Sequence, residues 1–237
     1  MAKLKFDIAT KFTDPREMPA YSIPLAAHYL RVPLTTLRYW VLGQTYRTDK
    51  GPKRAQPVIL LPDPRRHLLS FFNLAEAHIL RALRKEQKIQ LPDIRRAIDI
   101  VAARIKRPHP LLQDRFKTDG ARLFVEALEK QLIDASGFGQ MVMPELMEHL
   151  ERLDFEDKIV SRLYPFTRRN DAGPRTIFID PRYSFGRPVL DRIYVPTAVI
   201  GERYEAGESV EDLAKDYGCN GLEIEEAIRC ELSAKAA

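Results

Sequence analysis

Apolar residues recur at helical spacing in two short segments near the start of the chain. Four of them between positions 25 and 30 share one face of a helix that Ser22 caps, with Pro24 in its first turn. A break at 31–33 ends this helix, and residues 34–42 predict a second one that stops at Gly43. Two helices joined by so short a break predict a helix-turn-helix.

Two apolar runs follow, after a polar and basic stretch at 44–56. The runs at 57–61 and 67–72 flank a turn rich in proline and aspartate, which predicts a β-hairpin. A hairpin directly after a helix-turn-helix is a wing, so we predict a winged helix-turn-helix at 21–72. Residues 1–20 show little periodicity and predict a loosely ordered arm.

Helical patterns dominate the next part of the chain. Asn73, with Glu76 at the capping-box position, predicts a helix over 74–87. A second helix through about residue 105 completes a helical extension at 73–107. The pattern then weakens: short strands are expected at 121–136 and a helix at 143–153. We therefore expect a small α+β segment at 108–170, where two copies of the chain could meet.

Capping signals are clearest in the last quarter of the chain. A linker at 168–174 precedes a domain at 177–237, and a strand-like segment at 176–179 forms the entry to that domain. Its helices are expected at 196–206, 210–217 and 220–232, and their spacing resembles a helix-turn-helix. The predicted fold class is mainly α: an N-terminal winged helix-turn-helix, a small α+β middle segment and a C-terminal helix-turn-helix-like three-helix domain.

Composition limits the classes of protein to consider. The 237 residues are 45% hydrophobic and 30% charged, which is typical of globular proteins. We find no apolar run of 18 residues and no signal peptide at the start, so a soluble, cytoplasmic protein without a membrane partner is expected. Cys219 and Cys230 lack a second pair, which argues against a disulfide framework or a cysteine zinc site.

Charge is distributed unevenly along the chain. Between Arg31 and Arg66, eight basic residues face two aspartates, a net charge of +6 in 36 residues. Between Glu202 and Glu231, ten acidic residues face three basic ones, a net charge of −7. The front of the chain can attract a polyanion that the back would repel, so the two ends are expected to have different partners.

The second helix of the motif carries candidate base-reading side chains. In a helix-turn-helix this helix enters the major groove, and its outward residues reach the bases. Leu37 and Trp40 lie on the other stripe and are expected in the core. The outward residues are Thr35, Thr36, Arg38 and Tyr39. The basic stretch after it adds candidate phosphate contacts, namely Arg47, Lys50, Lys53 and Arg54.

Catalytic chemistry has little support. His149 and its glutamate neighbours on one predicted helix lack metal-ligand spacing, and a solvated helix face is the better interpretation. The other histidines are scattered, and no phosphate-binding glycine loop occurs. We expect no enzyme activity, no metal and no cofactor.

Longer strings of residues carry a family resemblance. Residues 21–40, which end in Thr-Leu-Arg-Tyr-Trp, resemble the winged helix-turn-helix of the MerR superfamily. Residues 69–84 and 94–97 look like the DNA-binding portion of VapB-type antitoxins. Residues 179–217 are similar to the small helical domain of many such antitoxins. Together these strings cover about two thirds of the chain.

The resemblance implies a type II toxin–antitoxin function. The partners would be the protein's own operator DNA, as a homodimer, and a VapC-type toxin with a PIN-domain ribonuclease fold. Many such antitoxins inhibit the toxin through a flexible C-terminal tail, whereas here only residues 233–237 resemble a tail. The toxin-contacting residues therefore cannot be carried over. The acidic helix at 222–232 is interpreted as a solvated face or as a surface for a basic toxin.

Two alternatives stay open. The first is a MerR-like transcriptional regulator with a small-molecule sensing region and no toxin, which needs a pocket in the middle of the chain. The second is a protein-interaction scaffold whose helix-turn-helix does not bind DNA.

Overall fold

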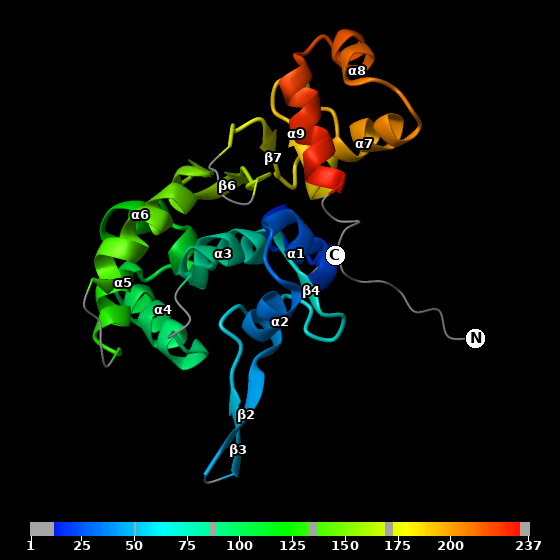
Figure 1. The fold of residues 1–237 in the computed structure, drawn as a ribbon. Helices are drawn as coiled ribbons and strands as arrows, with labels where there is room; N and C mark the ends of the chain where they lie inside the picture. The colour runs from blue at the N-terminus through cyan, green and yellow to red at the C-terminus, as the bar shows by residue number, and fades with distance from the viewer. Residues whose placement is uncertain (1–11, 50, 86–88, 133–136, 169–172, 233–237) are drawn as a thin grey trace.

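The computed structural model describes residues 12–49, 51–85, 89–132, 137–168 and 173–232, and it confirms the mainly α fold with a small α+β middle. One hydrophobic core runs from Tyr21 to Leu163 and includes Ile179, and a second core lies in the C-terminal unit. Helices α7–α9 lie at one end of the molecule and a β-hairpin projects from the other (Figure 1). The predicted domain boundaries stay predictions.

The first two helices form as the sequence predicts. Helix α1 (Ile23–Leu30) begins at Ser22, whose hydroxyl accepts from the Leu25 N–H at 3.3 Å. It ends at Arg31, which has a left-handed backbone with φ of +53°. Helix α2 (Leu34–Leu42) follows and stops at Gly43.

The wing lies elsewhere than predicted. Its strands are β2 (Gln44–Thr48) and β3 (Gly51–Ala55), inside the polar stretch, and not the apolar runs at 57–61 and 67–72. Those runs serve the core instead: Ile59 is buried, and β4 (Leu68–Leu69) pairs with β1 (Tyr21–Ser22). A hairpin that projects into solvent buries neither face beyond its base, so its sequence lacks the alternation by which strands are recognised.

Helix α3 (Phe71–Arg81) begins three residues before the predicted position. Its N-cap is Ser70, whose hydroxyl accepts from Asn73 N–H at 3.2 Å, and Asn73 Oδ1 accepts in return from Ser70 N–H at 3.1 Å. The pairs Ser70–Asn73 and Asn73–Glu76 both have the spacing of a capping box. Burial of Phe71 and Phe72 favours a helix that starts after Ser70. Helix α4 (Leu91–Ile105) confirms its prediction.

The middle segment corrects the strands expected at 121–136. Residues 133–136 of that span lie outside the described residues, and Ala121–Glu129 is helix α5. Its buried residues Ala121, Phe124, Val125 and Leu128 follow helical spacing, which the apolar run at 123–125 masks in the sequence. Helix α6 (Phe138–Glu151) starts before the predicted residue 143, and strands β5 (Leu153–Glu156) and β6 (Ile159–Leu163) follow it as a hairpin.

His149 is buried, which corrects the solvated helix face predicted around it. Its side chain on α6 packs at a tilt against His78 of α3 and against Phe166, with ring centroids 4.9 and 4.8 Å away. A ring nitrogen of His78 lies 3.0 Å from the His149 carbonyl oxygen. Burial, together with the nearby His149, holds the pKa of His78 well below its ordinary value, so the ring is neutral. The pair packs α3 against α6.

The C-terminal unit matches its prediction closely. Strand β7 (Ile177–Phe178) pairs with β8 (Val189–Leu190), and three helices follow. These are α7 (Thr197–Glu205), α8 (Val210–Tyr217) and α9 (Gly221–Leu232). Ser209 caps α8 and Gly218 ends it, as expected. Their apolar faces meet at Ile200, Leu213 and Ile224, so this unit has its own core.

A buried carboxylate joins this unit to the middle of the chain. Glu226 of α9 is 1% exposed and accepts from Thr167 and from Arg168, the latter at 2.6 Å, while Arg229 also pairs with it. Burial raises the pKa of Glu226, but the hydrogen bonds and positive charges outweigh it and hold the pKa below its ordinary value. The carboxylate is therefore charged and holds α9 against residues 167–168.

The arm is attached where it is described. Arg16 pairs with Asp14 at 2.8 Å, lies over the Phe72 ring at 5.3 Å and donates to the Val160 carbonyl at 3.3 Å. Residues 12–20 therefore contact the main core, although the sequence predicts a loose arm. Residues 1–11 of the predicted arm lie outside the described residues.

Replacing Glu226 tests the joint. We expect Glu226→Gln to lower the free energy of unfolding by about 1–3 kcal/mol, because a neutral amide cannot satisfy two guanidinium groups. Glu225→Gln on the same helix is the control: Glu225 is 47% exposed and pairs with Arg229 at 3.5 Å, so its loss should stay below about 1 kcal/mol. Chemical denaturation measures both, and equal losses would contradict a structural role for the buried carboxylate.

Replacing Gly43 tests the connection between α2 and the wing. Gly43 has φ of +75°, and a Cβ atom there would lie 2.3 Å from the Ala55 carbonyl oxygen. We expect Gly43→Ala to destabilise the protein by about 2 kcal/mol or more, from backbone strain and this clash together. Gly51→Ala is the matched control: its φ is +103°, but no atom lies within 4 Å. A thermal melt in which Gly51→Ala loses more would contradict the close approach.

Candidate DNA interface

Helix α2 presents two opposite stripes, as the sequence predicts. Leu37 and Trp40 are buried in the main core, with exposed fractions of 0% and 5%. Thr35, Arg38 and Tyr39 are exposed, and Thr36 is half-buried. Burial of Leu37 and Trp40 fixes which side chains of α2 point outward. The side chains predicted to read bases are therefore on the surface, where they can contact a ligand.

The segment after the hairpin is tied back to α2. The Trp40 carbonyl accepts from the N–H groups of Val58 and Ile59 at 2.9 and 3.0 Å. Arg95 of α4 donates to the Pro57 carbonyl beside them. The base of the hairpin is thereby fixed next to the C-terminal end of α2.

The wing residues divide between the two faces of the hairpin. In the β2–β3 register, Thr45 lies opposite Arg54 and Tyr46 opposite Lys53. Because side chains alternate along a strand, Arg47 and Arg54 share one face and Lys53 shares the other with Tyr46. The two arginines are therefore diagonal neighbours. Lys50 lies outside the described residues.

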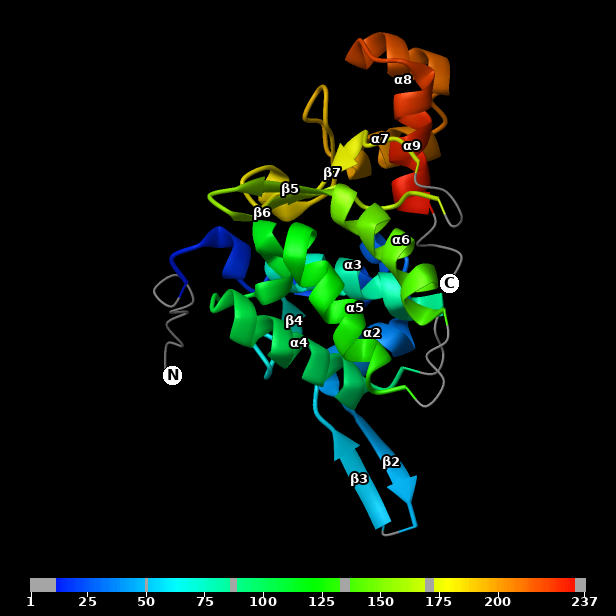
Figure 2. The same ribbon diagram turned by 90° about the vertical axis from the view of Figure 1, so that its left-hand side faces the viewer.

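Tyr46 is a surface residue that the sequence analysis missed. Its ring is 41% exposed, and it stands on the hairpin between Thr45 and Arg47. An aromatic residue among polar ones in a strand is the signal that could have identified it. Figure 2 shows the hairpin reaching away from the helical body, so both of its faces are open to a ligand.

The opposite end of the molecule is acidic. Glu202, Glu205, Glu211, Asp212 and Asp216 are exposed on α7 and α8. Arg203 pairs with Glu208 and Asp216, which leaves an excess of negative charge there. This surface repels DNA and lies at the far end from the hairpin (Figure 1).

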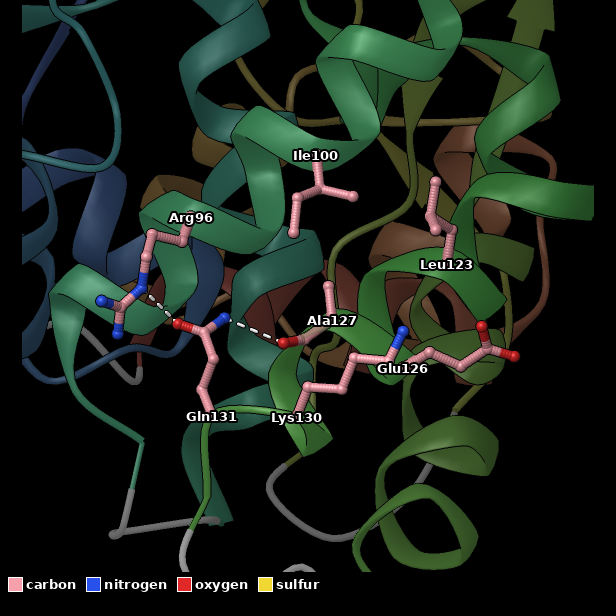
Figure 3. Close-up of a pocket in the computed structure, with 7 residues that line it drawn as sticks. All are labelled: Arg96, Ile100, Leu123, Glu126, Ala127, Lys130 and Gln131. Carbon is pink, nitrogen blue, oxygen red and sulfur yellow. Dashed lines mark hydrogen bonds between the residues drawn. The ribbon is translucent and has the colours of Figure 1, made fainter.

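The sensing-regulator alternative needs a pocket for a small molecule, and a groove between α4 and α5 is the candidate. Its cavity is about 420 Å³, and Figure 3 shows Ile100, Leu123 and Ala127 around it. Its polar side chains lie at the edge and do not converge on the cavity: Gln131 bonds to Arg96 and to the Ala127 carbonyl, Glu126 pairs with Arg122, and Lys130 also lines the rim. The groove therefore lacks the converging polar groups that orient a specific ligand.

Other kinds of site find little support in the described residues. Among them, no group of three or more His, Cys, Asp and Glu side chains is placed to hold a metal ion. No helix within the described ranges has the length and apolar character needed to span a membrane.

Two models of known protein families match separate segments of the chain. Residues 19–98 match the family model described as "Putative DNA-binding HTH domain", which contains α2 and the wing. Residues 177–229 match the model described as "Protein of unknown function (DUF433)", which covers most of the C-terminal unit.

A comparison of sequences and a comparison of structures extend the similarity over most of the chain. The chain is 29% identical over 230 residues to a Mycobacterium tuberculosis protein named "Putative antitoxin VapB45", across 90% of this chain and 93% of that protein. The X-ray crystal structure of Rv2018 from Mycobacterium tuberculosis has the same fold, with a TM-score of 0.62 at 23% identity over 89% of this chain and 97% of that one. These relatives do not test the resemblance to the MerR superfamily, which stays a prediction. The resemblance to VapB-type antitoxins with an N-terminal helix-turn-helix is confirmed.

Proposed function

We propose that this chain is the antitoxin of a type II toxin–antitoxin pair, which binds its own operator DNA and inhibits a VapC-type PIN-domain ribonuclease. The observation that carries the proposal is the exposed face of α2 beside a projecting basic hairpin. A 29% identical relative that is named as a putative antitoxin supports the proposal that the chain inhibits a toxin. The chain acts by binding rather than by catalysis.

Each side chain of the interface has a role that follows from its chemistry. Arg38, exposed near the middle of α2, can donate two hydrogen bonds to the O6 and N7 atoms of a guanine. Thr35 and Thr36 lie one turn earlier and reach bases or phosphates, and Tyr39 packs on the edge of the DNA major groove. Arg47 and Arg54, on one face of the wing, bind phosphates, as do Lys50 and Lys53. These phosphate contacts set affinity, and α2 sets sequence preference.

The operator complex should contain two copies. Helix-turn-helix proteins read palindromic half-sites as two-fold dimers, so we propose a homodimer that represses its own operon. We place the contact between copies at the groove between α4 and α5. Helix α5 lies inside the segment 108–170, where the sequence predicts this contact, and α4 precedes that segment. Its floor is apolar, and its rim carries both signs of charge, Arg96 and Lys130 against Glu126, which a two-fold related copy can complement.

DNA binding is tested with the DNA upstream of the gene. We expect Arg38→Ala to weaken binding by about 1–3 kcal/mol and to relax preference at one base pair. Arg47→Ala and Arg54→Ala should weaken binding to all sequences alike, and each should reduce the slope of log K against log salt by about 1. Lys215→Ala, an exposed cation on α8, is the control and should change neither quantity.

Mobility-shift titration over a range of salt concentrations measures these effects, and sedimentation gives the number of chains per operator. The absence of salt-sensitive, sequence-dependent binding by the unmodified protein would favour the scaffold alternative. One chain per operator would contradict the homodimer.

Toxin binding is tested by co-expression with the product of the adjacent reading frame. We expect the two proteins to co-purify and the chain to rescue growth from the toxin. Arg38→Ala should rescue growth as well as the unmodified chain, because α2 reads DNA and the toxin is bound elsewhere. If DNA binding persists while the two proteins neither co-purify nor restore growth, the sensing regulator becomes the better explanation.

A further inference from the structure

Helix α2 carries an exposed leucine in its first turn, next to the side chains that we assign to DNA. Leu34 is the first residue of α2, and 41% of its surface is open to solvent. The buried residues of this helix are Leu37, Trp40 and Val41, so Leu34 lies outside the stripe that packs into the core. A leucine in this place gives up part of the stabilisation that burial provides.

Leu34 shares its side of the helix with Arg38. Residues four apart on an α-helix lie on the same face, at about 6 Å from each other along the axis. Both side chains are exposed, and so is Thr35 beside them. A ligand that reaches the guanidinium group of Arg38 therefore also meets the side chain of Leu34.

The surroundings of Leu34 indicate which ligand this is. Among the described residues no acidic side chain pairs with Arg38, so its guanidinium group is available to a ligand. Helix α2 lies beside the base of the β2–β3 hairpin, which carries Arg47 and Arg54 (Figure 1). This environment favours a polyanion, and DNA is the polyanion of the proposed function.

The chemistry of a leucine selects one feature of the DNA. A leucine forms no hydrogen bond with a phosphate or with the polar groups of a base edge. The major groove displays one apolar group among the base edges, which is the 5-methyl group of thymine, and apolar side chains recognise thymine by packing against it. Leu34 therefore fits thymine and none of the other three bases.

The spacing of the two side chains predicts where this thymine lies. Base pairs follow one another at about 3.4 Å along the duplex, so the distance of about 6 Å between residues four apart corresponds to about two base-pair steps. The thymine should thus lie about two base pairs from the guanine that Arg38 binds.

We propose that Leu34 is a specificity-determining residue that reads one thymine in each operator half-site by packing against its 5-methyl group. The inference rests on the proposed function, since it assigns a base to the DNA-binding face of that antitoxin. The other possible occupants of this face are a second copy of the chain and the toxin, and the test separates them from DNA.

The test removes the methyl group from the DNA and the leucine from the protein. Each thymine of the upstream DNA is replaced in turn by deoxyuridine, which lacks only the 5-methyl group, and mobility shift gives the dissociation constants. For the unmodified chain we expect a rise of about fourfold at one thymine of each half-site, as for the loss of one buried methyl group. Leu34→Ala should bind the unaltered DNA about tenfold more weakly, and deoxyuridine at that thymine should change its binding by less than about 1.5-fold.

Two variants serve as controls. Leu222 lies in the first turn of α9 and is 69% exposed, so Leu222→Ala removes a comparable side chain from the acidic end of the molecule. It should keep the operator affinity and the fourfold effect of deoxyuridine. Leu34→Met keeps an apolar side chain of similar volume and should keep the effect as well. Thermal melts show whether each variant is folded, and the measurement on the unmodified chain needs no variant.

Each outcome decides between the inference and the function on which it rests. If the unmodified chain does not bind the upstream DNA, the inference and the DNA-binding part of the proposed function both fail. If it binds and no thymine responds to the loss of its methyl group, or if the response persists in Leu34→Ala, the inference fails and the proposed function stands. If Leu34→Ala loses its homodimer or its binding to the adjacent product and keeps the response to deoxyuridine, Leu34 contacts protein and the inference is overturned.

Discussion

The placement of Trp40 is the constraint on which the candidate interface depends. Its ring is buried in the main core, and burial of Leu37 on the same stripe fixes the rotation of α2 about its axis. Its carbonyl accepts from Val58 and Ile59, so the chain that leaves α2 as the hairpin must return to the same place. One residue thus orients the outward face of the helix and closes the base of the wing. The hairpin can project without a core of its own because its two ends are fixed in this way.

Local signals predicted the parts of the fold that local chemistry determines. The caps at Ser22 and Ser209, and the stops at Gly43 and Gly218, each satisfy backbone groups of their own helix, and the structure confirms them. Where two local patterns compete, the sequence predicts the wrong one. The apolar run at 123–125 hides the helical period of α5 and predicts strands, and two capping-box spacings compete for the start of α3.

Other features have no signal in the sequence. His149 is buried because His78 and Phe166 come to it from distant segments, and nothing near it in the chain indicates that. The turn Ser184–Gly186, in which Phe185 has a left-handed backbone, is held by the Tyr21 hydroxyl, which lies 165 positions before Gly186. The interface on α2 was easier to predict, since its two stripes lie within one helix. The structure exposes three of the four predicted α2 residues, and their contact with DNA stays a prediction.

The helix-turn-helix and the C-terminal unit differ in charge. Salt acts differently on the DNA contacts of the wing and on the contacts that join the two units. Phosphate contacts at the exposed wing release counterions and weaken steeply as salt rises. The joint at Glu226 is buried, so its ion pairs with Arg168 and Arg229 are screened much less. Two further links end on backbone carbonyls: Tyr21 donates to Gly186, and Arg31 donates to Arg229 at 2.6 Å. Ion pairs nearer the surface also cross between the units, such as Arg162 with Asp191 at 3.2 Å and Arg182 with Glu156 at 2.6 Å, and these are screened more. The two carbonyl bonds are made by residues that flank α1, and together with the buried joint they depend little on salt. A rise in ionic strength can therefore weaken DNA binding while the two units stay joined.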